Sequence, residues 1–165
     1  AKAGVIGSPE LFQRLEDGGT NLSWIIREAV AVKIDVVEAD PYERGRRAVL
    51  NLGHTFAHAF ERLSDYQLRH GEAVAMGTAV AARLAVDLGH CPSDVSQRII
   101  ALLDHLGLPT APPDYEPEAV WEAMMSDKKK QGKQLRFVLP LGIGGVDVFD
   151  DVPREAALAV LKQLV

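Results

Sequence analysis

Hydrophobic residues recur at intervals of three and four through most of the first 125 positions, the spacing typical of helices with one buried face. The clearest stripe runs from Leu22 to Val37. Proline, glycine and capping residues such as Ser8-Pro9 and Asp40-Pro41 separate one stripe from the next. The pattern predicts helices over residues 1–6, 8–17, 22–37, 48–63, 70–88, 93–106 and 118–125.

The period changes near residue 135. Residues 135–139 and 146–149 are short aliphatic, β-branched and aromatic runs, separated by the proline- and glycine-rich stretch 140–145. This pattern predicts a hairpin-like pair of strands, followed by a last helix over residues 153–165. We therefore expect a mainly α-helical domain spanning residues 1–165, with a small β hairpin late in the chain.

The predicted helix over residues 70–88 differs from the others because small residues dominate it. Its alanines and glycines include Ala73, Ala75, Gly77, Ala79, Ala81, Ala82 and Ala85. Small side chains let neighbouring helices approach closely, so we expect this helix to be central.

Composition narrows the class of protein. With 165 residues and 47% hydrophobic content, the chain is long enough for one well-buried core. The net charge of −5 comes from interspersed acids and bases, so nucleic acid is not an expected partner. No run approaches the ~18 apolar residues of a membrane span, and a membrane partner is not expected. The single cysteine, Cys91, cannot form an internal disulfide, which favours a cytoplasmic location.

Three of the five histidines lie within seventeen residues. His54 and His58 are four apart and therefore share a helix face, and His70 begins the next predicted helix. Imidazole is the commonest protein ligand for zinc-like ions. The string His-Thr-Phe-Ala-His lacks the glutamate of the zinc proteases. The alternative is a structural pair of histidines satisfied by backbone carbonyls.

Several cations could bind a carboxylate or phosphate by charge-assisted hydrogen bonds: Lys33, Arg47, Lys128, Lys129 and Lys130. Alternatively, these cations are solvated surface residues with no ligand, and the run 128–130 beside Gly132 has the composition of an exposed loop. The sequence leaves two interpretations for Asn51, one helical turn before His54: it contacts a ligand, or it faces solvent. Glu72 could be a metal ligand by residue type, but the helix dipole already accounts for a carboxylate in the first turn of a helix.

Taken together, several long segments resemble the 3-dehydroquinate synthase family. The matching segments are residues 47–61 (RAVLNLGHTFAHAFE), 70–77 (HGEAVAMG), 127–129 (DKK) and 137–140 (FVLP), with Lys33, Val36-Val37, Asp40, Glu43 and Gly45-Arg46-Arg47 upstream. The resemblance spans essentially the whole chain. It implies conversion of 3-deoxy-arabino-heptulosonate 7-phosphate to 3-dehydroquinate and phosphate in the shikimate pathway, by transient oxidation with NAD, phosphate elimination, re-reduction, ring opening and aldol closure.

The resemblance also implies roles for particular residues. His54 and His70 would be two ligands of a catalytic zinc or cobalt ion, and His58 would lie near the substrate phosphate and assist proton movements. Lys33, Arg47 and Asn51 would hold the substrate in the catalytic position. Lys2 and one of Lys128 or Lys129 would neutralise its carboxylate or phosphate.

The front of the chain departs from the family pattern. The family's third metal ligand, a glutamate three residues before the position matched by Lys2, falls outside this sequence. No Gly-x-Gly-x-x-Gly follows a predicted strand, so we expect the NAD-binding N-terminal domain to be absent. Because Ala1 is not methionine and the sequence opens directly into a predicted helix, we expect the start of the chain to be a cut. We expect this fragment to be inactive by itself. We also expect it to bind a metal ion only weakly and not to bind NAD. The family's usual homodimer is also implied.

Other interpretations remain open. Another sugar-phosphate cyclase, making a deoxyinosose or valiolone ring, would share the fold, NAD, metal and mechanism but not the substrate. A metal-dependent alcohol dehydrogenase is more remote, because it needs fewer phosphate-directed cations. A non-catalytic helical interaction domain would carry the same histidines and lysines as structural or solvated groups.

Overall fold

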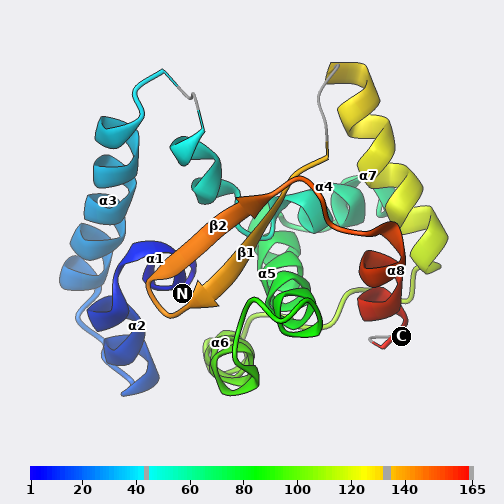
Figure 1. Ribbon diagram of the computed structural model, residues 1–165. Coiled ribbons are helices and arrows are strands. Elements are labelled where there is room, and N and C mark those ends of the chain that lie inside the picture. Colours follow the sequence, from blue (N-terminus) through cyan, green and yellow to red (C-terminus); the bar gives the residue numbers. More distant parts are fainter. Residues whose placement is uncertain (43–44, 132–134, 164–165) are drawn as a thin grey trace.

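The computed structural model describes residues 1–42, 45–131 and 135–163, with side chains omitted for 127–131. The chain forms a layer of helices crossed by one hairpin (Figure 1). In order the elements are α1 (Lys2–Gly7), α2 (Pro9–Glu16), α3 (Leu22–Ala39), the 3₁₀ helix η1 (Arg46–Asn51), α4 (His54–Leu63), α5 (His70–Asp87), α6 (Ser93–His105), α7 (Pro117–Gln131), β1 (Phe137–Gly142), β2 (Gly145–Phe149) and α8 (Arg154–Lys162). The predicted fold class, mainly helical with a late hairpin, is confirmed.

The first helices begin and end at the residues that the sequence indicates. Ser8 caps α2 by accepting a hydrogen bond from the Leu11 amide at 3.2 Å, and Asn21 caps α3 by accepting one from the Trp24 amide at 3.1 Å. Between them, Gly18 adopts a φ of +74°, which only glycine reaches without strain. Each cap satisfies a backbone N–H in the first turn of its helix.

Helix α5 is the centre of the molecule, as its small residues predict. It contacts α4, α6, α8 and β1, and it runs behind the hairpin in Figure 1. Its buried residues are Ala73, Ala75, Met76, Gly77, Thr78, Ala79, Val80, Ala81, Ala82, Leu84 and Ala85. A helix buried on nearly every side needs such short side chains, because its neighbours approach from several directions.

The prediction of one continuous helix over residues 48–63 is wrong. The segment is divided into η1 and α4 by Gly53, which adopts a φ of +79°. A Cβ on Gly53 would lie 2.6 Å from the Thr78 amide nitrogen, and a Cβ on Gly77 would lie 2.1 Å from the Gly53 carbonyl oxygen. The two backbones therefore touch without side chains between them, and this contact with α5 decides where α4 begins.

The hairpin is tighter than the sequence pattern indicates. Strands β1 and β2 pair antiparallel, and Pro140 lies opposite Val146 within the ladder instead of in the turn. A two-stranded sheet has free edges, where proline's missing N–H costs no ladder bond. At the turn, the Gly144 amide donates to the Val5 carbonyl at 3.0 Å, so the hairpin holds α1 in place.

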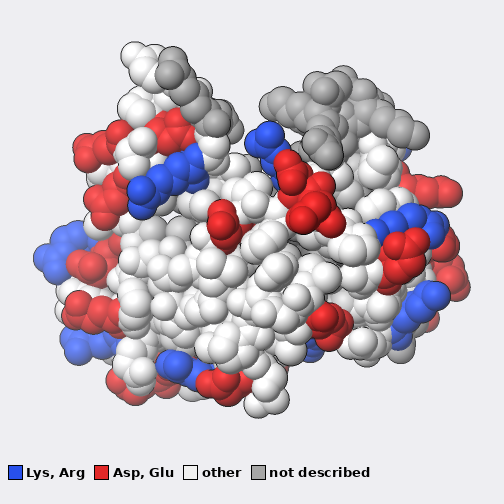
Figure 2. All heavy atoms as spheres, in the orientation of Figure 1, with Lys and Arg blue, Asp and Glu red and all other residues white. Residues whose placement is uncertain are grey.

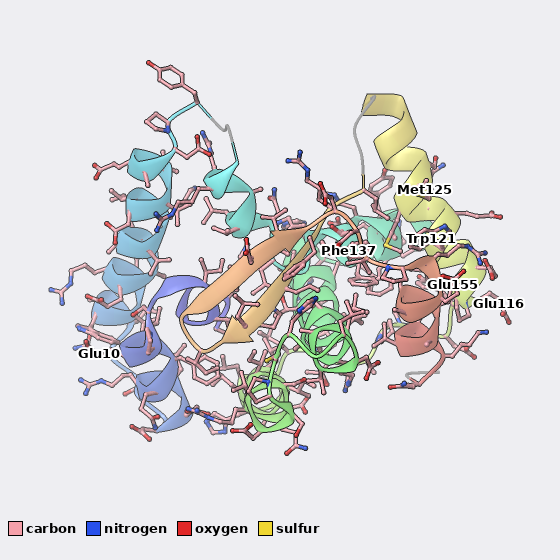
Figure 3. All side chains as sticks on the ribbon, in the orientation of Figure 1. Glu10, Glu116, Trp121, Met125, Phe137 and Glu155 are labelled. Carbon is pink, nitrogen blue, oxygen red and sulfur yellow. The ribbon has the colours of Figure 1, made fainter. Side chains whose placement is uncertain are left out.

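Helix α7 extends the predicted segment 118–125 and closes the core on the side opposite α3. Phe137 lies at the start of β1, and Trp121 and Met125 occupy the side of α7 toward α4 (Figure 3). The Phe137 ring centroid is 5.5 Å from that of Phe56 on α4. The last helix is shorter than predicted and ends at Lys162; residues 164 and 165 lie outside the described residues.

Charged side chains gather at the periphery of the face drawn in Figure 2, while the centre over the hairpin carries few. Glu10, Glu116 and Glu155 lie at the outer edges (Figure 3). Within the described part of the chain, none of the helices has the length and apolar character needed to cross a bilayer.

The contact between Gly53 and Gly77 predicts that Gly77→Ala destabilises the fold. The added methyl group would overlap the Gly53 carbonyl, where backbone cannot give way cheaply. We expect the free energy of unfolding, measured by urea denaturation with circular dichroism, to fall by about 1–3 kcal/mol.

The matched control is Gly71→Ala in the first turn of the same helix, where an added Cβ meets nothing within 4 Å. This variant should keep or slightly raise the stability of the wild type. Equal stability of the two variants would show that the helices have room to separate at Gly77.

Candidate functional site

The structure brings the three predicted histidines together. The ring centroid of His54 lies 5.6 Å from that of His58 and 5.3 Å from that of His70, and the His58 and His70 centroids are 6.4 Å apart. His54 and His70 are the first residues of α4 and α5. The cluster thus depends on how these two helices pack.

His54 is a neutral imidazole with one nitrogen already engaged. Its Nδ1 lies 3.1 Å from the Leu52 carbonyl oxygen, which can only accept, so Nδ1 carries the hydrogen and Nε2 the lone pair. Burial, followed by the positive charge of Lys2, lowers the pKa of His54 to about 4. The ring is therefore unprotonated at neutral pH, as a metal ligand must be.

His70 has a comparable hydrogen bond, to a side chain. Its Nδ1 lies 2.9 Å from Glu61 Oε1 on α4. Glu61 was not among the predicted site residues, although the sequence holds a signal for it. It lies seven positions after His54 and three after His58, which puts all three on one face of a helix.

A cavity of about 300 Å³ lies beside the histidines, between α1, α3 and η1. Its cations are Lys2 and Lys33, and its apolar wall includes Ile6, Ala29, Val32 and Leu50. The histidines are not among the residues that line this cavity. Lys2 links the two regions, because its charge acts on His54.

Lys2 is held in place and is electrostatically stressed. Its Nζ donates to the Leu50 carbonyl at 2.9 Å. Burial lowers the pKa of the Lys2 ammonium, and the nearby charge of Lys33 lowers it further. Two cations at one cavity, one of them partly desolvated, favour an anionic ligand.

Arg47 and Asn51 belong to η1 and not to the histidine helix. Buried Asp40 accepts hydrogen bonds from the amides of Gly45 at 2.9 Å and Arg47 at 3.0 Å, which fixes the entry into η1. Asn51 is exposed at the other end of η1. It is not one helical turn before His54, because Gly53 interrupts the helix.

Lys128 and Lys129 fall on the last turns of α7, whose backbone is helical through Gln131. The interpretation of this run as an exposed loop is therefore wrong for the backbone. Their side chains lie outside the described residues, and their predicted contacts with a ligand stay predictions.

The donor set fits part of a metal site. His54 and His70 each keep one nitrogen on a hydrogen-bonded oxygen and leave Nε2 for an ion, the arrangement common to metal-binding histidines. Among the side chains that the structure describes, no group of three or more His, Cys, Asp or Glu residues is placed to hold a metal. The assignment of His54 and His70 as metal ligands therefore stays a prediction.

Comparison with known sequences gives consistent matches. A family model described as 3-dehydroquinate synthase C-terminal matches residues 1–130. A 3-dehydroquinate synthase of Synechococcus sp. (strain CC9605) is 42% identical over 174 residues, which cover 99% of this chain and 47% of that protein. One from Syntrophotalea carbinolica is 46% identical over 140 residues, covering 84% of this chain and 39% of its own. The chain thus spans about half the length of the curated relatives it matches.

Solved structures share the fold. A 2-epi-5-epi-valiolone synthase from Streptomyces hygroscopicus subsp. jinggangensis 5008, with NAD⁺ and Zn²⁺ bound, matches with a TM-score of 0.86 and 26% identity over 99% of this chain and 48% of its own. A 2-deoxy-scyllo-inosose synthase complexed with carbaglucose-6-phosphate, NAD⁺ and Co²⁺ gives a TM-score of 0.82 at 22% identity over 99% of this chain and 49% of its own. The second match supports the fold alone.

The pKa of His54 leads to a pH prediction. An ordinary histidine in the unfolded chain takes up a proton near pH 6.5, whereas the folded ring resists protonation until about pH 4. The stabilising contribution of neutral His54 is complete above pH 6.5 and is lost as the pH falls toward 4. NMR titration of the His54 ring protons should give a midpoint near 4, with falling stability across this window.

Lys2→Met tests whether the charge of Lys2 contributes to the lowered pKa of His54. Removing the lysine charge should raise the pKa of His54 while leaving it below 6.5, because burial remains the larger cause. Lys162→Met, on α8, removes an equal charge elsewhere and should leave the His54 midpoint unchanged. A wild-type midpoint near 6.5 would contradict the buried, neutral state of this ring.

Proposed function

The chain belongs to the 3-dehydroquinate synthase C-terminal family, and on that basis we propose that it is the metal- and substrate-binding half of a 3-dehydroquinate synthase. The proposed reaction converts 3-deoxy-arabino-heptulosonate 7-phosphate to 3-dehydroquinate and phosphate, in the shikimate pathway. The observation that carries the proposal is the cluster of His54, His58 and His70 beside a cavity with two lysines.

The proposed cofactors are NAD and a zinc or cobalt ion. The structural relatives supply this argument, since one holds NAD⁺ with Zn²⁺ and another NAD⁺ with Co²⁺. When bound, NAD takes up and returns a hydride, and the metal polarises the hydroxyl at the carbon being oxidised. His54 and His70 would hold the metal through Nε2.

The remaining residues would bind and orient an anionic substrate. Lys2 and Lys33 face one cavity and would neutralise its carboxylate or phosphate. Arg47 and Asn51, carried by η1, would fix its orientation. His58, exposed beside the other two rings, would hold or move a proton near the phosphate. Lys128 or Lys129 would add a further cation.

We propose that NAD binds mainly to a preceding domain, because the relatives are about twice as long as this chain. The fragment would then be inactive by itself and would lack the third metal ligand. The proposed compartment is the cytoplasm, where Cys91, a buried free thiol, needs no disulfide partner.

A sibling cyclase is the second candidate, because both solved structures described above are sugar-phosphate cyclases with other products. Identity favours dehydroquinate synthase: the chain is 42% identical to a relative of that name and 26% identical to the valiolone synthase. A non-catalytic helical domain predicts no binding of divalent metal or sugar-acid phosphate, so either titration separates it from an enzyme half.

The proposal predicts a specific activity for the protein extended upstream through the NAD-binding domain. With NAD and zinc or cobalt, it should release phosphate from 3-deoxy-arabino-heptulosonate 7-phosphate and form 3-dehydroquinate. His54→Ala and His70→Ala should each reduce phosphate release by at least about 100-fold, since each removes a metal ligand.

The matched control is His105→Ala, a histidine at the end of α6, which should retain wild-type activity. A folded, metal-loaded protein that is inert on this substrate but active on another sugar phosphate would point to the sibling cyclase. A protein that binds neither metal nor sugar-acid phosphate would support the non-catalytic alternative.

We also propose a homodimer, with an exposed face of α3 as the contact. The apolar side chains along this face are 65%, 53%, 48% and 47% exposed, in the order Leu22, Ile26, Val30 and Ile34. Their spacing of four makes a ridge of the kind that packs against an identical ridge. Exposed Arg27 and Asp35 flank the ridge on the same side.

A twofold axis near Val30 makes this face self-complementary. In an antiparallel pair, Ile26 of one chain faces Ile34 of the other, and Arg27 comes within reach of Asp35 of the second copy. Opposite charges at both ends of the contact favour this pairing over a parallel one, in which like charges would meet.

The dimer proposal predicts a charge-reversal pattern in sedimentation velocity. Arg27→Asp should weaken the dimer, because two acids then meet, and the double variant Arg27→Asp/Asp35→Arg should restore it. Leu141→Glu, which adds a charge to an exposed apolar residue of the hairpin, should leave the dimer intact. Dimers of the single variant as tight as the wild type would place the contact elsewhere.

A further inference from the structure

Glu61 is a carboxylate that the fold shields from solvent and directs at the histidine cluster. Its side chain is 13% exposed, whereas the side chain of His70, which it contacts, is 60% exposed. The contact joins Glu61 Oε1 to His70 Nδ1 at 2.9 Å. A shielded, fixed group therefore holds a side chain that would otherwise move in solvent.

The bond decides which nitrogen of His70 carries the hydrogen. A carboxylate only accepts, so His70 Nδ1–H donates, and in the neutral ring Nε2 keeps its lone pair. His54 has the same pattern through the Leu52 carbonyl. The two rings, with centroids 5.3 Å apart, thus both leave Nε2 available to a metal. His54 is fixed by a backbone carbonyl and His70 by a side chain.

The connection between α4 and α5 fixes the distance over which Glu61 acts. It turns through Asp65 and Tyr66, both with positive φ (51° and 60°), a conformation that costs a non-glycine residue of order 1 kcal/mol or more. Ser64 Oγ accepts a hydrogen bond from the Leu68 amide at 3.3 Å. This tight turn starts α5 alongside Glu61, within one hydrogen bond of its carboxylate.

We propose that Glu61 is a positioning residue, which holds the His70 imidazole in the tautomer and orientation that offer Nε2 to a divalent metal. The proposal rests on the proposed metal site and adds to it a residue that is not a ligand. Without Glu61, the ring of His70 would rotate and exchange its hydrogen between the two nitrogens. The metal would then bind at the cost of ordering that ring.

Two measurements on the 165-residue chain test this role. The first is the pair of ¹⁵N shifts of the His70 ring without metal at pH 8, which report the tautomer directly. The second is the dissociation constant for Co²⁺, measured by calorimetry. In Glu61→Ala we expect the Nδ1–H form to give way to a mixture dominated by Nε2–H, and cobalt to bind about 10–100-fold more weakly.

Two variants separate positioning from charge and from folding. Glu61→Gln keeps an acceptor oxygen, so it should retain more of the Nδ1–H form and of the cobalt affinity than Glu61→Ala. Glu72→Gln removes an equal charge from the first turn of α5, where Glu72 pairs with Arg69 at 3.8 Å, and should leave the His70 tautomer unchanged. Circular dichroism confirms that each variant is folded.

The outcomes distinguish this inference from the function on which it rests. A wild-type His70 in the Nε2–H form, or a Glu61→Ala chain with unchanged tautomer and cobalt affinity, would overturn the positioning role. A wild-type chain that shows the Nδ1–H form but binds no cobalt would refute the proposed metal site instead.

Discussion

The contact between the backbones of Gly53 and Gly77 is the constraint on which the site depends. Two helices can touch at this distance only where neither has a Cβ, and the alanine-rich face of α5 extends that close packing along the contact. Because α4 begins at this point, His54 is placed at its first residue, and the rest of α4 brings His58 and Glu61 beside His70. A small displacement here would move His54, His58 and Glu61 away from His70 together.

The electrostatics of the site follow from that packing. Burying His54 next to Lys2 makes protonation of the ring unfavourable, so this imidazole stays neutral at neutral pH. The positive charge resides on the lysines of the adjacent cavity. The neutral ring of His54 and the positive charges of the cavity are thus separate parts of one region.

Much of this arrangement could be predicted from the sequence, because hydrophobic periodicity and capping residues act locally. The helices α2, α3, α5 and α6 begin and end close to their predicted limits for that reason. The division at Gly53 could not be predicted, because a glycine within an apolar stripe is compatible with a helix until a second backbone needs its space. Glu61 was missed because its contact with His70 needs α4 to pack against α5, although its place on the face of His54 and His58 is visible in the sequence. Pro140 was missed because a proline between two strand-like runs is typical of a turn, and only the register of the hairpin places it opposite Val146.

The hairpin has a consequence for the order in which this domain can form. Its turn binds the carbonyl of Val5 through the amide of Gly144, so α1, near the start of the sequence, contacts a turn that comes late in it. During synthesis, helices such as α4 and α5 can form as they leave the ribosome, because their contacts are local. The contact between the hairpin and α1 can form only after residues 137–149 have been translated, later than all residues of the histidine helices, whereas the bond from Lys2 to the Leu50 carbonyl needs only the first 50 residues.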